Sequence, residues 1–81
     1  MKYPDVSKVK TTDDYCLIIE FANGETKTFD VKPYIKGSWY GQLKNLSTFK
    51  TVKPCGNTVE WVGGQDIAPH ELYECSTSVV Q

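Results

Sequence analysis

The first 31 residues contain three stretches in which apolar and polar side chains tend to alternate, a pattern typical of half-buried β-strands: residues 5–11, 15–22 and 25–31. The second stretch is the clearest, since Leu17, Ile19 and Phe21 share one face. In the first stretch Val6 and Val9 stand three positions apart, so strict alternation fails and a β-bulge would fit. We therefore predict an antiparallel meander of three strands.

Short turns separate these strands. Asp13-Asp14 follows the first strand, and Asn23-Gly24 follows the second. Asn-Gly is the strongest short signal for a two-residue hairpin of type I′, because both central residues of that turn need a positive φ. The turn at Asn23-Gly24 thus supports antiparallel pairing of the second and third strands.

After residue 31 the pattern becomes less regular, and Pro33 turns the chain away from the third strand. Four further elements are predicted: a short helix over residues 39–45 with Ser38 as its N-cap, strands over 48–52 and 58–62, and a helix over 66–75. The predicted fold class is α+β, with an antiparallel sheet of about five strands and the element order β-β-β-α-β-β-α. We expect one domain over residues 1–81, with its compact core at about 5–75 and a frayed tail at 76–81.

The composition fits a small globular domain. The 81 residues are 40% hydrophobic and 23% charged, which excludes a disordered tail and a coiled coil. No apolar run is longer than residues 16–19, so we expect no membrane span. The first residues lack the apolar core of a signal peptide, and we therefore expect a cytoplasmic protein.

The charges are unevenly spread. All nine basic residues are lysines within residues 1–53, where six carboxylates leave a charge of +3, whereas residues 54–81 carry four carboxylates and a charge of −4. The sequence contains no arginine, the usual reader of guanine edges and phosphates. Because the net charge of −1 gives only weak attraction to a phosphate backbone, we do not expect this chain alone to bind nucleic acid.

The sequence offers little for catalysis or metal binding. His70 is the only histidine, and no serine or cysteine stands near it in a motif for nucleophilic catalysis. Gly63-Gly64 lacks the lysine of a phosphate-binding loop. The three cysteines are far apart and form no C-x-x-C pair, so we expect buried or half-buried thiols and no zinc site: Cys16, Cys55 and Cys75. We expect neither an enzyme nor a bound cofactor.

Aromatic residues that follow the meander favour protein binding. Tyr34, Trp39 and Tyr40 stand close together in sequence, and tyrosine and tryptophan are common anchors of interfaces. In the alternative interpretation Trp39 covers one end of the sheet. The meander also leaves a sheet edge that could pair with a second copy of the chain or with a strand of a small protein partner.

Two stretches, residues 29–33 and 65–69, share the pattern of an aspartate, a branched apolar residue, any residue and a proline. We expect Asp30 and Asp66 to cap backbone N–H groups where the chain leaves a strand. In the alternative interpretation the two carboxylates lie together and bind a metal ion or act in acid–base catalysis. A bound cation would need more oxygen ligands than the two aspartates supply. Trp61 is expected to have a structural role, on one face of its strand.

One set of spaced residues covers most of the chain: Tyr15-x-Leu17-x-Ile19-x-Phe21-x-x-Gly24-Glu25, then Phe29-Asp30, Leu43 and Phe49, then Val59-x-Trp61-x-x-Gly64-x-Asp66-Ile67-x-Pro69-x-x-Leu72-Tyr73. This set resembles a bacterial family, the domain of unknown function 2442, over about residues 5–73. The resemblance implies a small α+β fold in which short helices pack an antiparallel sheet. It implies no known reaction, because none is assigned to the family.

The resemblance also suggests a biological setting. Family members similar to this chain are commonly stand-alone proteins of this size, and some are encoded beside a second small protein in what resembles a toxin–antitoxin pair. Others carry the domain ahead of a helix-turn-helix, which we do not expect after Tyr73. We therefore expect a non-catalytic module for protein–protein interaction, antitoxin-like in its setting. A nucleic-acid-associated or ligand-sensing regulatory domain is the alternative.

Overall fold

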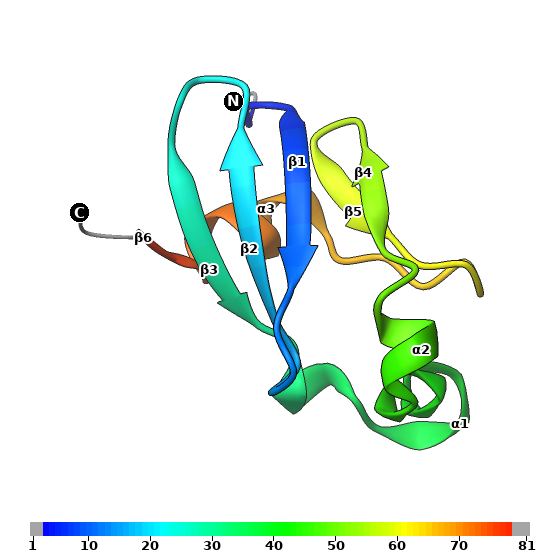
Figure 1. Ribbon diagram of the computed structural model, residues 1–81. Coiled ribbons are helices and arrows are strands. Elements are labelled where there is room, and N and C mark those ends of the chain that lie inside the picture. The colour runs from blue at the N-terminus through cyan, green and yellow to red at the C-terminus, as the bar shows by residue number, and fades with distance from the viewer. Residues whose placement is uncertain (1–2, 79–81) are drawn as a thin grey trace.

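The polypeptide folds as an α+β structure, which confirms the predicted fold class. The computed structural model describes residues 3–78, and of Ser38 and Trp39 it describes only the backbone. The elements follow one another as β1 (Val6–Thr11), β2 (Cys16–Phe21), β3 (Thr26–Asp30), η1 (Lys32–Tyr34), α1 (Gly37–Tyr40), η2 (Gly41–Lys44), α2 (Leu46–Phe49), β4 (Lys53–Cys55), β5 (Thr58–Glu60), α3 (Pro69–Glu74) and β6 (Thr77–Ser78). Four strands form one sheet in the order β1-β2-β3-β6, and β4 and β5 pair as a separate hairpin instead of extending the predicted single sheet (Figure 1).

The predicted meander of β1, β2 and β3 is present. Both pairs of neighbouring strands are antiparallel, and their register places Leu17, Ile19 and Phe21 on the buried face. The ladder between β1 and β2 shifts between Val6 and Lys8. This shift is a β-bulge, which agrees with the three-residue spacing of Val6 and Val9 in the sequence.

The turn between β2 and β3 is not the predicted two-residue turn of type I′. The Phe21 N–H donates to the Glu25 carbonyl at 2.8 Å and the Gly24 N–H donates to the Phe21 carbonyl at 3.0 Å, so the loop has three residues. Gly24 has a positive φ of 93°, whereas Asn23 does not. Such a loop is a type I turn closed by a left-handed glycine, which glycine adopts without a steric clash. The Asn-Gly signal therefore predicted the hairpin correctly and its turn type wrongly.

A second loop repeats this hydrogen-bond pattern. The Trp61 N–H donates to the Gln65 carbonyl at 2.8 Å, and the Gly64 N–H donates to the Trp61 carbonyl at 2.9 Å. Gly64 has a φ of 89°. Residues 21–25 and 61–65 thus form the same kind of loop, each with a buried aromatic residue first and a glycine fourth.

The strand predicted over residues 48–52 is wrong. The chain forms α2 there, because the Asn45 Oδ1 accepts hydrogen bonds from the backbone N–H groups of Ser47 at 2.9 Å and Thr48 at 3.3 Å. Asparagine is a favoured N-cap, and this cap outweighs the β-branched residues that suggested a strand. The strand β4 begins later, at residue 53.

The remaining elements also differ in extent from the prediction. The helix predicted over residues 39–45 is divided between α1 and η2, and α3 begins at Pro69, because proline suits the first position of a helix. Thr77 and Ser78 pair with β3 as β6, so this part of the predicted frayed tail is an edge strand. Residues 79–81 lie outside the described range.

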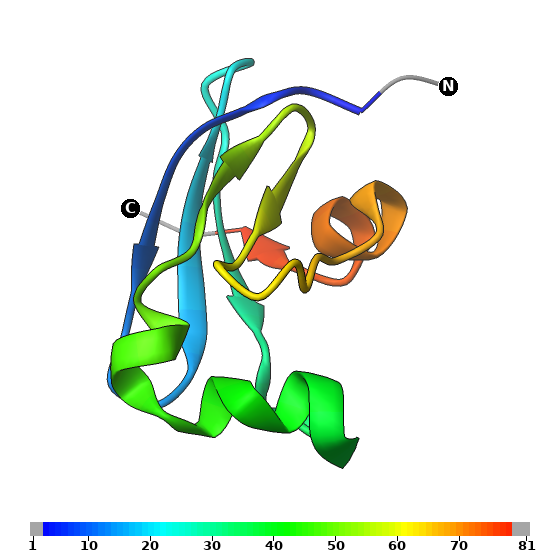
Figure 2. The same ribbon diagram turned by 90° about the vertical axis from the view of Figure 1, so that its right-hand side faces the viewer.

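The hydrophobic core lies on one side of the sheet, between the strands, the β4–β5 hairpin and α3 (Figure 2). Trp61 is 1% exposed, stacks on Phe49 with 6.1 Å between ring centroids, and donates its Nε1–H to the Phe49 carbonyl at 2.9 Å. The buried apolar residues form one cluster: Val6, Leu17, Ile19, Phe21, Phe29, Val31, Leu43, Phe49, Val59, Trp61, Ile67 and Leu72. This one-sided core leaves the other face of the sheet outside it.

Candidate binding surface

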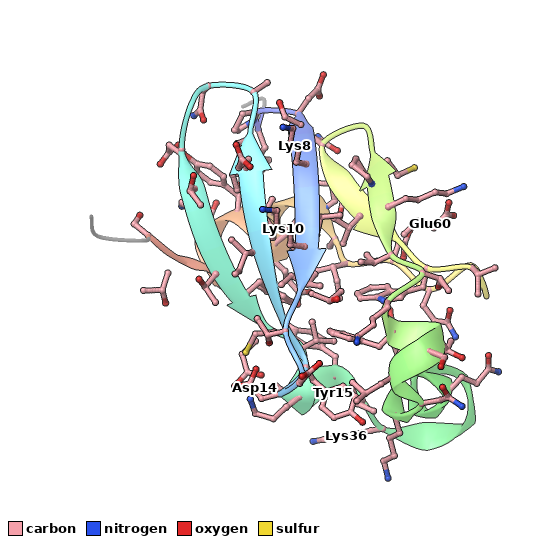
Figure 3. All side chains as sticks on the ribbon, in the orientation of Figure 1. Lys8, Lys10, Asp14, Tyr15, Lys36 and Glu60 are labelled. Carbon is pink, nitrogen blue, oxygen red and sulfur yellow. The ribbon has the colours of Figure 1, made fainter. Side chains whose placement is uncertain are left out.

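The second face of the four-stranded sheet points away from the core. In the described part of the chain, the hairpin and α3 lie on the opposite side of the sheet (Figure 2). The strand residues that alternate with the buried ones make up this face, which we call the open face: Lys8, Lys10, Cys16, Ile18, Glu20, Thr26, Thr28 and Asp30. Figure 3 shows Lys8 and Lys10 projecting from it.

The centre of the open face is less polar than its rim. One row of paired residues crosses the four strands at this point. Ile18 of β2 pairs with Lys10 of β1 on one side and with Thr28 of β3 on the other, and Thr28 also pairs with Thr77 of β6. Ile18 and Thr28 are half-buried, although the hairpin and α3 lie on the opposite side of the sheet from this face (Figure 2). A partly apolar centre within a charged rim is the arrangement found in many protein interfaces.

The charged rim is built mainly on β1 and β2. Lys8 pairs with Glu20 across the two strands, and both side chains are exposed. Within residues 3–78 the ion pairs join Lys32 to Asp30 and Lys50 to Asp13, so Lys8 and Lys10 take part in neither. The ammonium groups on β1 are therefore available to carboxylates of another molecule.

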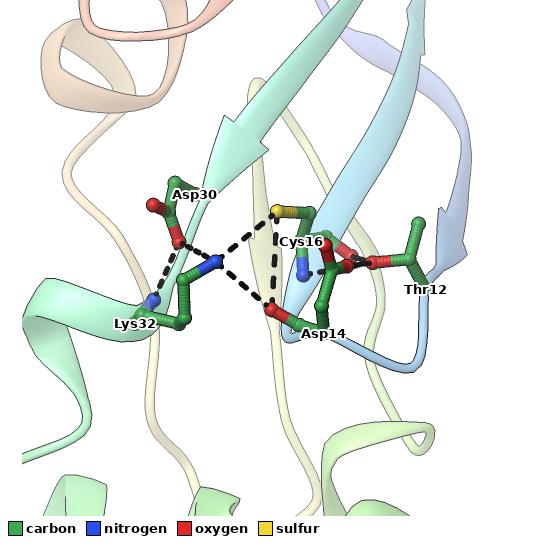
Figure 4. Close-up of polar contacts among 5 residues, drawn as sticks. All are labelled: Thr12, Asp14, Cys16, Asp30 and Lys32. Carbon is green, nitrogen blue, oxygen red and sulfur yellow. Dashed lines mark hydrogen bonds and ion pairs between the residues drawn. The ribbon is translucent and has the colours of Figure 1, made fainter.

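A cluster of polar groups closes one end of the open face (Figure 4). The Lys32 Nζ lies 3.1 Å from the Asp30 Oδ1 and 3.1 Å from the Asp14 carbonyl oxygen. It also lies 3.9 Å from the Cys16 Sγ. The Asp30 Oδ1 accepts a second hydrogen bond from the Lys32 backbone N–H at 2.9 Å, and the Thr12 hydroxyl donates to the Asp14 carboxylate. These contacts join the β1–β2 turn to the end of β3.

The charges in this cluster support one another. The hydrogen bond with Asp30 raises the pKa of the Lys32 ammonium above its ordinary value. The hydrogen bond from the Thr12 hydroxyl lowers the pKa of the Asp14 carboxyl. Both groups are therefore charged at neutral pH, and because both are exposed, water and salt screen much of their mutual attraction.

Tyr15 holds the same turn in a strained backbone conformation. Its φ of 65° is rare for an aromatic residue. The Tyr15 ring packs edge-on against Phe49 with 5.2 Å between centroids, and its hydroxyl donates to the Lys44 carbonyl. Its own carbonyl accepts the Val31 N–H at 3.0 Å. Contacts to three other segments thus keep this residue in the left-handed region.

Two of the three aromatic residues predicted to bind a partner also make contacts inside the domain. The Tyr34 hydroxyl donates to the Glu71 Oε2 at 2.6 Å, and the Tyr40 hydroxyl donates to the Asp66 carbonyl at 2.8 Å. Both tyrosines are half-buried, and they tie η1 to α3 and α1 to the segment that leads into α3. The side chain of Trp39 lies outside the described part of the structure.

The residues expected to have structural roles use different contacts. The Asp30 carboxylate accepts the Lys32 backbone N–H, whereas α3 begins after Ala68 without a side-chain cap. The contact of Asp66 is made by its backbone carbonyl, which accepts a hydrogen bond from the Tyr40 hydroxyl. The two similar stretches that contain these aspartates therefore fold with different local hydrogen bonds.

The three thiols are free and belong to different parts of the fold. Cys16 is half-buried on the open face, while Cys55 in β4 and Cys75 after α3 are exposed, so the expected burial is wrong for the last two. Among residues 3–78, no group of three or more histidine, cysteine, aspartate or glutamate side chains is arranged to hold a metal ion. No helix in that range is long and apolar enough to cross a membrane.

A buried lysine ties β3 to the end of α3. Lys27 is 9% exposed, its Nζ donates to the Tyr73 carbonyl at 2.9 Å, and the same atom lies 3.7 Å from the centroid of the Tyr73 ring. The Tyr73 hydroxyl donates to Glu25, and its ring meets Phe21 edge-on at 5.1 Å. A carbonyl and an aromatic face together replace part of the water that the ammonium loses.

Comparison with known families matches residues 6–78 to the family described as Protein of unknown function (DUF2442). The chain belongs to this family. The matched range begins at β1 and ends at β6, which confirms the resemblance inferred from the spaced residues. No curated protein and no solved structure matched the chain.

The open face of this DUF2442 domain is the feature that sequence reasoning did not single out. Alternation along β2 already placed Cys16, Ile18 and Glu20 together, opposite the apolar residues. Whether a helix covers such a face depends on tertiary packing, which no local pattern reports. The sequence analysis also missed the role of Lys27. Alternation with Phe29 places Lys27 on the covered face, but its partner Tyr73 in α3 is brought to it only by tertiary packing.

Proposed function

We propose that this DUF2442 domain is a non-catalytic module that binds another protein through its open face. The observation that carries the proposal is the one-sided packing of the sheet, which leaves Ile18 and Thr28 half-buried at the centre of a face without a covering layer. A small domain has a thin core, and a partner that covers such a face would bury apolar surface that the chain alone leaves in water.

The rim of the open face favours a partner of particular chemistry. The partner would be apolar opposite Ile18 and would carry carboxylates near Lys8 and Lys10, which extend from β1. Glu20 already faces Lys8 across the strands, so Lys10, which pairs with Ile18, would gain most from a new carboxylate. Charges at such a rim mainly speed association and select the correct partner.

We further propose that the partner is the second protein of a two-gene pair, with this domain as the antitoxin-like member acting in the cytoplasm. Support comes from the setting that resemblance to the family implies, in which a small protein is encoded beside such a domain. The partly apolar centre and the charged rim of the open face fit binding of a protein surface, and the lack of arginine argues against nucleic acid as the ligand.

The proposal is tested by capture from the lysate of the protein's own host, with and without nuclease. Three tagged proteins are compared: the wild type, Ile18→Lys and Val62→Lys. Val62 is 73% exposed in the loop after β5, so its substitution makes the same chemical change away from the open face. The melting temperature of each variant is measured first, to show that it folds.

We expect the wild type and Val62→Lys to retain one small protein at a stoichiometric level after nuclease, and Ile18→Lys to lose it. A charged group at the centre of an interface has to be desolvated without a partner, which strongly weakens binding. Capture of the same protein by all three would show that another surface binds it, such as the sheet edge at β6. Nucleic acid that nuclease removes, or no captured protein, would contradict the proposal.

A further inference from the structure

We propose that the loop between β2 and β3 contains a latent deamidation site at Asn23-Gly24, and that Glu25 and Tyr73 restrain its reaction. This inference is independent of the proposed function. It rests on three hydrogen bonds within the loop and one that reaches it from α3.

The chemistry needs only the chain and water. The backbone nitrogen of Gly24 attacks the side-chain Cγ of Asn23, so that a N–Cγ bond forms and the Cγ–Nδ2 bond breaks. Ammonia leaves, carrying the proton that the Gly24 nitrogen gives up. Water then opens the cyclic imide at either carbonyl and leaves aspartate or isoaspartate. A glycine after the asparagine favours this reaction, since no side chain hinders the attack.

The site is accessible to solvent. Asn23 and Gly24 are exposed at the tip of the hairpin, and a Cβ placed on Gly24 would meet no atom within 4 Å. Water can therefore reach both the imide and the departing ammonia. The loop thus presents a reactive dipeptide without steric protection.

The fold instead restrains the reacting groups through hydrogen bonds. The Asn23 Oδ1 accepts the Glu25 N–H at 3.0 Å, and the Asn23 Nδ2 donates to the Glu25 Oε1 at 2.6 Å. The Gly24 N–H donates to the Phe21 carbonyl at 3.0 Å. Attack requires the amide to turn and the Gly24 nitrogen to lose its proton, so these hydrogen bonds must break first.

Tyr73 fixes the carboxylate that holds the amide. Its hydroxyl donates to the same Glu25 Oε1 that accepts the Asn23 Nδ2. Hydrogen bonds from Tyr73 and then from Asn23 lower the pKa of Glu25, so the carboxylate is charged across the neutral range. The Lys27 ammonium in turn holds Tyr73 in place, because it donates to the Tyr73 carbonyl and lies over the Tyr73 ring. Tyr73 is therefore a positioning residue, through which the docking of α3 protects the loop.

Reaction at this site would change the hairpin itself. Aspartate would place a second carboxylate beside Glu25, and isoaspartate would add a backbone atom to a three-residue loop whose glycine already has a positive φ. Either product disturbs the connection between β2 and β3, the strands that carry the centre of the open face.

The test follows the conversion of Asn23 by peptide mapping and mass spectrometry during incubation of the full chain at mildly alkaline pH. The proteins are the wild type, Glu25→Ala, Glu25→Gln, Tyr73→Phe and Tyr3→Phe. Tyr3 donates its hydroxyl to Glu74 and its ring lies 5.6 Å from the ring of Tyr73, so Tyr3→Phe makes the same change without touching Glu25. Each rate is divided by the rate of the same chain in denaturant.

We expect Glu25→Ala to raise this ratio about three- to tenfold, as loss of one ordinary, solvent-exposed hydrogen bond implies, and Tyr73→Phe to raise it less. Glu25→Gln, which keeps an acceptor but no charge, should fall between wild type and Glu25→Ala, and Tyr3→Phe should match the wild type. The proposal is overturned if the wild type reacts as fast folded as in denaturant, or if none of the Glu25 and Tyr73 variants that fold reacts faster than Tyr3→Phe.

Discussion

The five tyrosines of the chain all use their hydroxyl groups to join segments that are distant in sequence. Their acceptors are carboxylates of α3 or of the β2–β3 loop and backbone carbonyls: Tyr3 to Glu74, Tyr15 to Lys44, Tyr34 to Glu71, Tyr40 to Asp66 and Tyr73 to Glu25. Tyrosine combines a large apolar ring with a polar end, which suits the half-buried margin of a thin core. These residues therefore stabilise the domain where its core is narrow.

The pair Tyr34–Glu71 gives a prediction for alkaline pH. The hydrogen bond to Glu71, with a smaller effect of burial, raises the pKa of Tyr34 from 10.0 to about 12. Between these two values the unfolded chain loses the phenolic proton while the folded chain keeps it, so the free energy of unfolding falls as pH rises through this window. Below pH 10 the contribution of Tyr34 is fully present.

Urea unfolding at a series of pH values checks this prediction. We expect Tyr34→Phe to lose less stability than the wild type between pH 10 and 12. Some loss should persist in the variant, because hydrogen bonds to carboxylates also raise the pKa values of Tyr3 and Tyr73. Glu71→Gln, which keeps an acceptor for the hydroxyl but removes the charge, should show an intermediate slope. Identical slopes for the wild type and Tyr34→Phe would show that this pair does not govern the alkaline response.

Two loops of the same construction set the ends of two strands. In residues 21–25 and 61–65 the first residue is a buried aromatic and the fourth is a glycine with positive φ. The aromatic residue anchors the loop in the core, and the glycine closes it. The conformational requirement therefore falls on Gly24 and Gly64.

Alanine substitutions distinguish the need for a positive φ at Gly24 and Gly64 from the general effect of replacing a flexible glycine. Gly24→Ala and Gly64→Ala should each lower the free energy of unfolding by about 1 kcal/mol, because a Cβ disfavours the left-handed region. Gly41 begins η2 without a positive φ and with open space around its Cβ position, so Gly41→Ala should raise stability by about 0.4–1 kcal/mol. Denaturant titrations of the three variants measure these changes. A shift in the same direction for all three would contradict the assignment.

The sequence predicted elements best where one local rule acted alone. Alternation predicted β2 and its buried face, and Asn23-Gly24 predicted the hairpin although not its loop length. The stretch over residues 48–52 was predicted wrongly because two local rules compete there: β-branched residues favour a strand, and the Asn45 cap favours a helix. β6 could not be predicted, since a two-residue strand exists only by pairing with β3.

The whole molecule has a packed side and an open side. The β4–β5 hairpin, α3 and the apolar cluster lie on one side of the sheet, α1 and α2 lie at one end of it, and the open face lies on the other side (Figure 2). The sequence specifies which residues share each face, but the position of the covering layer is a property of the complete fold. The predicted aromatic surface illustrates the limit, because Tyr34 and Tyr40 donate their hydroxyls to partners in the C-terminal third of the chain.

The cysteines offer a direct test of whether the open face binds the partner. Three single-cysteine variants, each with the other two cysteines replaced by serine, keep Cys16 on the open face, Cys55 on the hairpin or Cys75 after α3. The rate of thiol labelling by a maleimide is measured for each variant, alone and with the captured protein. We expect the partner to slow the labelling of Cys16 and to leave Cys55 and Cys75 unchanged. Slower labelling of Cys55 or Cys75, with Cys16 unaffected, would contradict binding through the open face.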